Sequence, residues 1–151
     1  MDLTLFVSPE HRQDEDFPRC FDAHTEQVRF ARDLGFDGVA IGNHLSYSDA
    51  AWFPPMESLM RLSTVAEGMT LSTCMLVLPM YHPLHVAQQA AMLDIVTNGR
   101  FILGVSQGWQ EEEFRVLGID FRERLGRFRE SVTLMQRLWT EESVDFTGKY
   151  F

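Results

Sequence analysis

The chain has 151 residues, enough for one domain with a sizeable core and too few for two ordinary domains. Apolar residues make up 45% and charged residues 23% of the chain, which excludes a disordered or low-complexity protein. The formal net charge of −9 argues against a general nucleic-acid-binding role, because neutralising phosphates requires a basic surface.

Four short apolar runs along the chain predict strands. They are continuous instead of alternating, which is typical of strands buried on both faces of a parallel sheet. The runs are Leu3–Val7, Gly38–Ile41, Leu71–Leu78 and Phe101–Val105.

A helical pattern follows each run. The first helix is expected to begin with Asp22 as its N-cap and to stop at Gly35, with Val28, Ala31 and Leu34 facing inward. The second and third are expected to begin at Pro55 and Pro83, since proline suits the first turn of a helix. The fourth, from about Glu123 to Trp139, has apolar residues at intervals of three and four.

The strands start near residues 3, 38, 70 and 101, a repeat that indicates βα units and a parallel sheet. Two architectures fit: a small doubly wound sheet, or four units of a (β/α)8 barrel, whose usual length is about 250 residues. A doubly wound dinucleotide site needs a glycine-rich first loop. The loop Ser8–Asp16 has no glycine and carries four carboxylates, which disfavours such a site.

Targeting and metal-binding signals are weak. The N-terminus lacks the basic segment of a signal peptide, and no apolar run approaches the roughly 20 residues of a membrane-spanning helix. Cys20 and Cys74 lie far apart, so we expect two reduced thiols in a cytoplasmic protein. The histidines form neither an HExxH motif nor a Cys/His cluster, so no metal site is expected, and His11 and His24 are expected at the surface.

Functional residues of parallel α/β folds lie where strands end and loops begin. His44 follows the second strand directly and could exchange protons or hydrogen-bond a bound ring, or it could be held by backbone groups in a turn. Cys74 is expected inside the third strand, as an inert packing residue instead of a nucleophile. The run Glu111–Glu113 and the arginines from Arg122 to Arg129 are expected to form a solvated face, although an arginine there could reach an anion.

Short motifs occur in a fixed order along the whole chain. They are Gly35-Phe36-Asp37-Gly38-Val39, Asn43-His44, Leu76-Val77-Leu78-Pro79, Gly99-Arg100-Phe101, Gly104-Val105, Gly108, Glu113-Phe114 and Leu138-Trp139. Together they resemble the luciferase-like flavin monooxygenase family, which includes bacterial luciferase, alkanesulfonate monooxygenases and deazaflavin-dependent reductases and dehydrogenases. The resemblance implies a (β/α)8 TIM-type barrel. Residues 1–151 would form its N-terminal four βα units, with the C-terminal half absent.

The resemblance also implies roles for individual residues. His44 would be catalytic, and Cys74-Met75 matches a position where the family often has a non-prolyl cis peptide bond. Gln107 stands where bacterial luciferase has an arginine near the flavin phosphate, a contact that Arg124 or Arg127 could supply instead. Asn43 stands where relatives carry an acidic residue. The cofactor-binding residues implied are therefore Asn43, Cys74, Met75, Gln107 and Arg124.

The function implied is that of a cytoplasmic bacterial oxidoreductase. It would use reduced FMN, supplied by a flavin reductase, and oxygen to oxygenate a small organic substrate. The alternatives are hydride transfer with a deazaflavin, or a truncated member that binds flavin without turnover. The full-length protein is expected to be a homodimer that binds neither nucleic acid nor membrane, and these 151 residues alone are expected to be inactive. The aromatic segment Tyr47–Phe53 could form an apolar lid or pack on the barrel rim.

Overall fold

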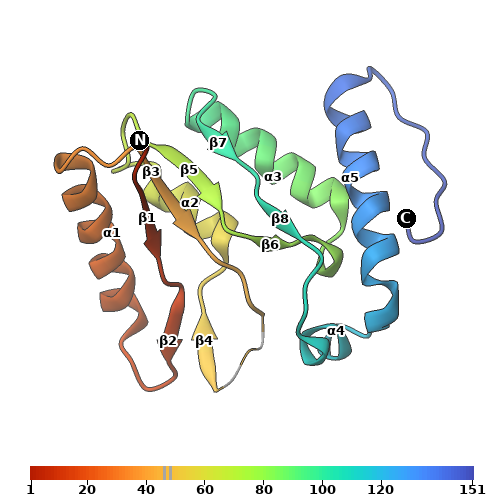
Figure 1. Ribbon diagram of the computed structural model, residues 1–151, viewed down its shortest axis with the longest axis horizontal. Coiled ribbons are helices and arrows are strands. Elements are labelled where there is room, and N and C mark those ends of the chain that lie inside the picture. Colours follow the sequence, from red (N-terminus) through yellow and green to blue (C-terminus); the bar gives the residue numbers. More distant parts are fainter. Residues whose placement is uncertain (46, 48) are drawn as a thin grey trace.

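A parallel sheet of four strands forms the centre of the computed structural model, which describes residues 1–45, 47 and 49–151 (Figure 1). All neighbouring strands in this sheet run parallel, so the expected βα repeat and parallel α/β fold are confirmed. The strands follow one another in chain order: β1 (Thr4–Val7), β3 (Gly38–Ile41), β5 (Thr70–Thr73) and β7 (Phe101–Ile102).

Four longer helices flank this sheet: the first three contact its strands, and the last packs against the third (Figure 1). They are α1 (Phe17–Asp33), α2 (Pro55–Leu62), α3 (Pro83–Val96) and α5 (Arg124–Thr140). The expected starts of α2 and α3 at their prolines are confirmed. No helix among the described residues is long and apolar enough to cross a membrane.

Helix α1 begins six residues earlier than the sequence pattern indicates. Asp16, and not Asp22, is its N-cap, because the Asp16 carboxylate accepts a hydrogen bond from the backbone nitrogen of Arg19 at 3.3 Å. The helix ends just before Gly35, as expected. Val28 and Ala31 are buried as expected, but Leu34, which was also expected to face the core, is 62% exposed.

Two of the four apolar runs are each split into two strands. The third run forms β5 and β6 (Leu76–Val77), and the fourth forms β7 and β8 (Val105–Ser106), which pairs with β6 in parallel. Cys74 and Met75 lie between β5 and β6 and are exposed, so the expectation that Cys74 is buried inside a strand is wrong. The remaining short elements are β2 (Glu10–Arg12), β4 (Ala50–Trp52), the 3-10 turns Leu78–Met80 and Phe121–Glu123, and α4 (Glu111–Val116).

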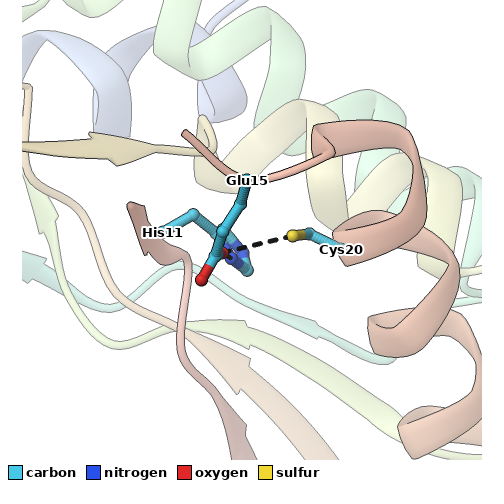
Figure 2. Close-up of side chains that lie close together, drawn as sticks. All are labelled: His11, Glu15 and Cys20. Carbon is cyan, nitrogen blue, oxygen red and sulfur yellow. Dashed lines mark hydrogen bonds and ion pairs between the residues drawn. The ribbon is translucent and has the colours of Figure 1, made fainter. Parts of the chain in front are cut away.

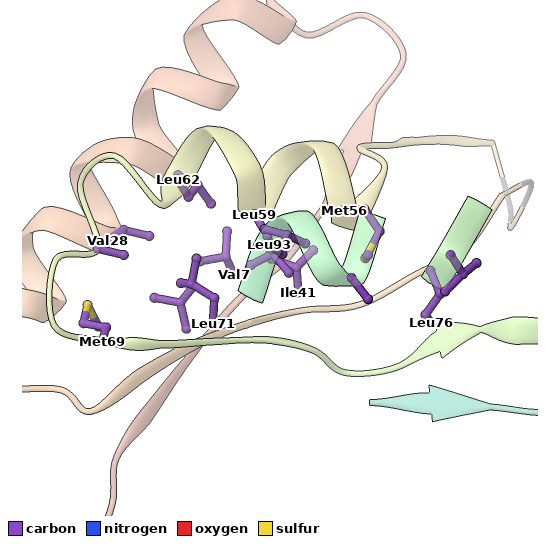
Figure 3. Packing of buried hydrophobic residues seen from close by; sticks show 14 of the residues in the cluster. Val7, Val28, Ile41, Met56, Leu59, Leu62, Met69, Leu71, Leu76 and Leu93 are labelled. Carbon is purple, nitrogen blue, oxygen red and sulfur yellow. The ribbon is translucent and has the colours of Figure 1, made fainter. Parts of the chain in front are cut away.

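The two faces of the parallel sheet are covered unequally. Apolar side chains on the helix-covered face form the core, with Val7, Ile41 and Leu71 packed against α2 and α3 (Figure 3). On the opposite face, Phe6 of β1 is 53% exposed and Ile102 of β7 is 58% exposed. The expected burial on both faces therefore holds for β3 but is wrong for the outer strands.

Candidate active site

The ends of the strands meet at a cavity of about 400 Å³. His44, Cys74 and Gln107, which come from three different loops, all line this cavity. The other lining residues are Phe6, Gly42, Asn43, Trp52, Met75, Val77, Ser106, Gly108 and Trp109.

A carboxylate that is distant in sequence contacts His44. Both carboxylate oxygens of Glu113 lie 3.2 Å from Nδ1 of His44. One of them also accepts a hydrogen bond from the backbone nitrogen of Leu45 at 2.6 Å. The side chain of Glu113 is 1% exposed and that of His44 is 19% exposed, so only the imidazole reaches the cavity. The tautomer that donates from Nδ1 to Glu113 leaves Nε2 as the basic nitrogen of the ring.

Glu113 is the residue of this site that the sequence pattern did not indicate. Glu111 and Glu112 are exposed as expected, but the third residue of the run is buried, together with its neighbour Phe114. The three residues begin α4, a helix that the sequence pattern did not predict. The sequence signal that could have identified Glu113 is the large apolar residue directly after it, Phe114.

Three aromatic side chains surround the His44 ring. Tyr47 stacks on it with ring centroids 4.7 Å apart, and Trp52 and Trp109 contact it edge-on at 4.7 and 6.0 Å. The indole nitrogen of Trp52 donates a hydrogen bond to the carbonyl of Tyr47 at 3.2 Å. Within the aromatic segment 47–53, of which Ser48 lies outside the described residues, Tyr47 and Trp52 therefore pack around His44 and shield the imidazole from water, whereas Phe53 packs against His11.

Asn43 joins the end of β3 to the neighbouring chain. Its buried side-chain oxygen accepts hydrogen bonds from the backbone nitrogen of Val77 at 3.0 Å and from the hydroxyl of Tyr81 at 3.2 Å. Burial raises the pKa of Tyr81, so its hydroxyl stays protonated and can donate. Asn43 therefore fixes the shape of the cavity wall.

Of the other residues expected to bind the cofactor, three line the cavity and one does not. The peptide bond between Cys74 and Met75 is cis, as the resemblance implies, and both residues line the cavity. Gln107 is exposed at the cavity wall. Arg124 lies elsewhere: its guanidinium is 4.0 Å from the centre of the Phe121 ring and donates a hydrogen bond to the Phe121 carbonyl at 3.1 Å.

Gly108 is expected to be the most sensitive glycine of the cavity wall. Its φ is +77°, and a Cβ there would lie 2.6 Å from a methyl group of Val77 and 2.9 Å from the ring of Phe114. We expect Gly108→Ala to lower the free energy of unfolding by roughly 2 to 4 kcal/mol, through backbone strain and overpacking. Urea denaturation followed by circular dichroism measures this loss.

Gly118 offers a matched control for that substitution. Its φ is +68°, but a Cβ there would meet nothing within 4 Å. Gly118→Ala should therefore lower the free energy of unfolding through backbone strain alone, by about 1 kcal/mol. Equal losses for the two variants would show that the contacts of Gly108 do not constrain it.

The sequence matches the luciferase-like monooxygenase family over residues 1–151. The chain belongs to the luciferase-like monooxygenase family. Among curated relatives, an F420-dependent glucose-6-phosphate dehydrogenase of Intrasporangium calvum is 39% identical over 143 residues. The oxygenase component of a flavin-dependent trigonelline monooxygenase of Acinetobacter baylyi is 28% identical over 142 residues. These matches cover 89% and 92% of this luciferase-like chain, which spans only 42% and 39% of the two relatives.

A solved structure shows the same fold. It is the oxygenating constituent of 3,6-diketocamphane monooxygenase from the CAM plasmid of Pseudomonas putida, in complex with FMN. The TM-score is 0.90 at 24% sequence identity, and the match covers 100% of this chain and 42% of that chain. The luciferase-like chain thus superimposes on part of a larger protein.

Proposed function

We propose that residues 1–151 are the N-terminal four βα units of a luciferase-like barrel, and that the full-length protein is a flavin-dependent monooxygenase. It would use reduced FMN and oxygen to oxygenate a small organic substrate. The observation that carries this proposal is the His44–Glu113 pair, which presents an imidazole to a cavity at the strand ends. Catalytic residues of βα barrels occupy this position.

The cavity fits the flat ring of a flavin. Its volume of about 400 Å³ lies in the range of small-molecule sites, and Phe6, Val77 and Trp109 give it apolar walls. Polar contacts to the ring edge would come from the amide of Gln107 and from the exposed turn Cys74-Met75. A phosphate contact from Arg124 would require its guanidinium to leave the ring of Phe121.

When bound, the reduced flavin supplies the electrons that activate oxygen. The residues of this chain would control protons and water around that chemistry. His44 would hold or accept a proton at Nε2, and Glu113 would keep the ring in one orientation and balance its positive charge. The rings of Tyr47, Trp52 and Trp109 would exclude water from the pair.

The proposal includes partners and a location. A flavin reductase would supply the reduced cofactor. The Acinetobacter baylyi relative is the oxygenase component of its monooxygenase, which supports a separate reductase. We also propose a homodimer in the bacterial cytoplasm. The two free thiols, Cys20 and Cys74, are compatible with a reducing compartment.

Hydride transfer with a deazaflavin is the second candidate function. An imidazole backed by a buried carboxylate is suited to take the hydroxyl proton of an alcohol while a hydride leaves its carbon. The F420-dependent relative at 39% identity supports this candidate. The same residues, His44 and Glu113, would carry the proton in both reactions.

Cofactor titration of the full-length protein distinguishes the two candidates. We expect reduced FMN to bind and oxygen to be consumed when a substrate is present. Binding of the deazaflavin alone, without oxygen uptake, would establish the second candidate, and binding of neither cofactor would refute both.

A pair of glutamine variants tests whether the cofactor occupies this cavity. Gln107→Ala removes an amide from the wall and should weaken cofactor binding about 10-fold, the effect of one hydrogen bond. Gln27→Ala, on the exposed surface of α1, should leave affinity unchanged. Equal affinities for both variants would place the cofactor away from Gln107.

A further inference from the structure

Three side chains with metal-binding atoms meet outside the cofactor cavity (Figure 2). His11 lies on β2, Glu15 follows in the next bend, and Cys20 is in the first turn of α1. Nδ1 of His11 is 3.0 Å from a carboxylate oxygen of Glu15, and the sulfur of Cys20 is 3.3 Å from the same oxygen. All three donor atoms lie within 4.8 Å of one another.

The imidazole of His11 is fixed from behind. Its ring packs against His24 and Phe53, with centroid distances of 4.9 and 4.7 Å. Nε2 of His11 is buried and has no hydrogen-bond partner among the described residues, so Nδ1 is the nitrogen that faces Glu15 and Cys20. The expected surface positions of His11 and His24 are wrong, because their side chains are largely buried. Burial also lowers the pKa of His24, so a neutral ring lies behind the cluster.

We propose that Nδ1 of His11, the carboxylate of Glu15 and the sulfur of Cys20 bind a zinc ion, with water as the fourth ligand. Nitrogen, oxygen and sulfur are the donors that zinc takes in proteins. Around a tetrahedral zinc, donor atoms are about 3.3 to 3.5 Å apart. The contacts of Glu15 with His11 and Cys20, at 3.0 and 3.3 Å, are close to this spacing, and a side-chain rotation would bring Cys20 nearer to His11.

The surroundings of the cluster favour a divalent cation. The side chain of Glu15 is 39% exposed, which leaves one side open for a water ligand. Glu10, Asp14 and Asp49 line the adjoining hollow and add negative charge. Of these, Asp14 is paired with Arg12 at 2.8 Å.

Zinc binding replaces a proton at Cys20. Without the ion, the thiol donates a hydrogen bond to Glu15, and burial together with this carboxylate raises the pKa of Cys20. On binding, the S–H bond breaks, its proton passes to solvent, and a Zn–S bond forms as the hydrated ion gives up waters.

The ion would link the two-stranded sheet β2–β4 to helix α1. β2 carries His11 and pairs with β4 in antiparallel register, where Glu10 faces Trp52. Trp52 in turn contacts the ring of His44. Zinc would therefore fix to α1 the two-stranded sheet that supplies Trp52 to the cavity wall.

Zinc titration of the full-length protein tests this site, after reduction and removal of metal with a chelator. A chromophoric chelator reports the affinity, and cobalt reports sulfur ligation through its thiolate-to-metal absorption. We expect one zinc ion per chain. Cys20→Ser should weaken zinc binding at least about 100-fold and abolish the thiolate-to-cobalt absorption.

Matched variants distinguish this cluster from other donors. Cys74→Ser and His85→Asn, which lie outside the cluster, should keep the affinity and the cobalt absorption. If Cys20→Ser unfolds, Glu15→Gln at a half-exposed position serves instead and should also weaken binding. The proposal is overturned if no zinc binds, if the variants at Cys20 and Glu15 bind as the wild type does, or if His85→Asn removes binding.

Discussion

His44→Ala should lower the turnover of the full-length protein at least about 100-fold while leaving its fold intact, the effect expected when acid–base assistance is lost. The His44 side chain lines the cavity and is only 19% exposed, so water cannot readily take over its role in proton transfer. Turnover is measured as substrate-dependent oxidation of the reduced cofactor, and the fold by thermal unfolding. Unchanged turnover would show that His44 only stabilises the turn in which it lies.

Glu113→Gln tests whether the carboxylate works through His44. The amide can still accept the hydrogen bond from Leu45 but cannot balance a charge on the imidazole. Turnover should fall, and the double variant His44→Ala/Glu113→Gln should be no slower than His44→Ala alone, because the two residues act as a unit. Glu112→Gln is the control, since this exposed side chain pairs with Arg115 on the surface. Fully additive losses would show that Glu113 acts independently.

The 151-residue chain expressed alone should self-associate and bind flavin weakly. Its sheet ends in two outer strands, β1 and β7, which are open to pairing with other chains. The face opposite the helices also presents Phe6, at 53% exposure, and Ile102, at 58%. Sedimentation velocity measures the association, and flavin fluorescence measures the binding.

A charged variant tests the cause of that association. Ile102→Lys places a charge on an exposed position of the outer strand β7 and should shift the chain toward monomer. Val96→Lys, at an exposed position on α3, is the control and should leave association unchanged. A sharply melting wild-type monomer that binds flavin tightly would contradict the prediction.

Local spacing was sufficient to predict the repeating elements. Continuous apolar runs locate β1, β3, β5 and β7, and the prolines at 55 and 83 locate the starts of α2 and α3. These features depend on neighbours within a few residues, which the sequence displays directly. The position of His44 at a strand end follows from the same pattern, and the cis bond at Cys74-Met75 from the family resemblance.

Contacts between distant segments decided the rest. Glu113 reads as one of three solvated acids until the chain brings it against His44, 69 residues away. The donors of the cluster at His11 form no recognised spacing, and the fold of the short segment from β2 to α1 brings Cys20 to Glu15. Burial and pairing of a charged side chain depend on which segments fold over it, and a periodic pattern of apolar residues carries no information about that partner.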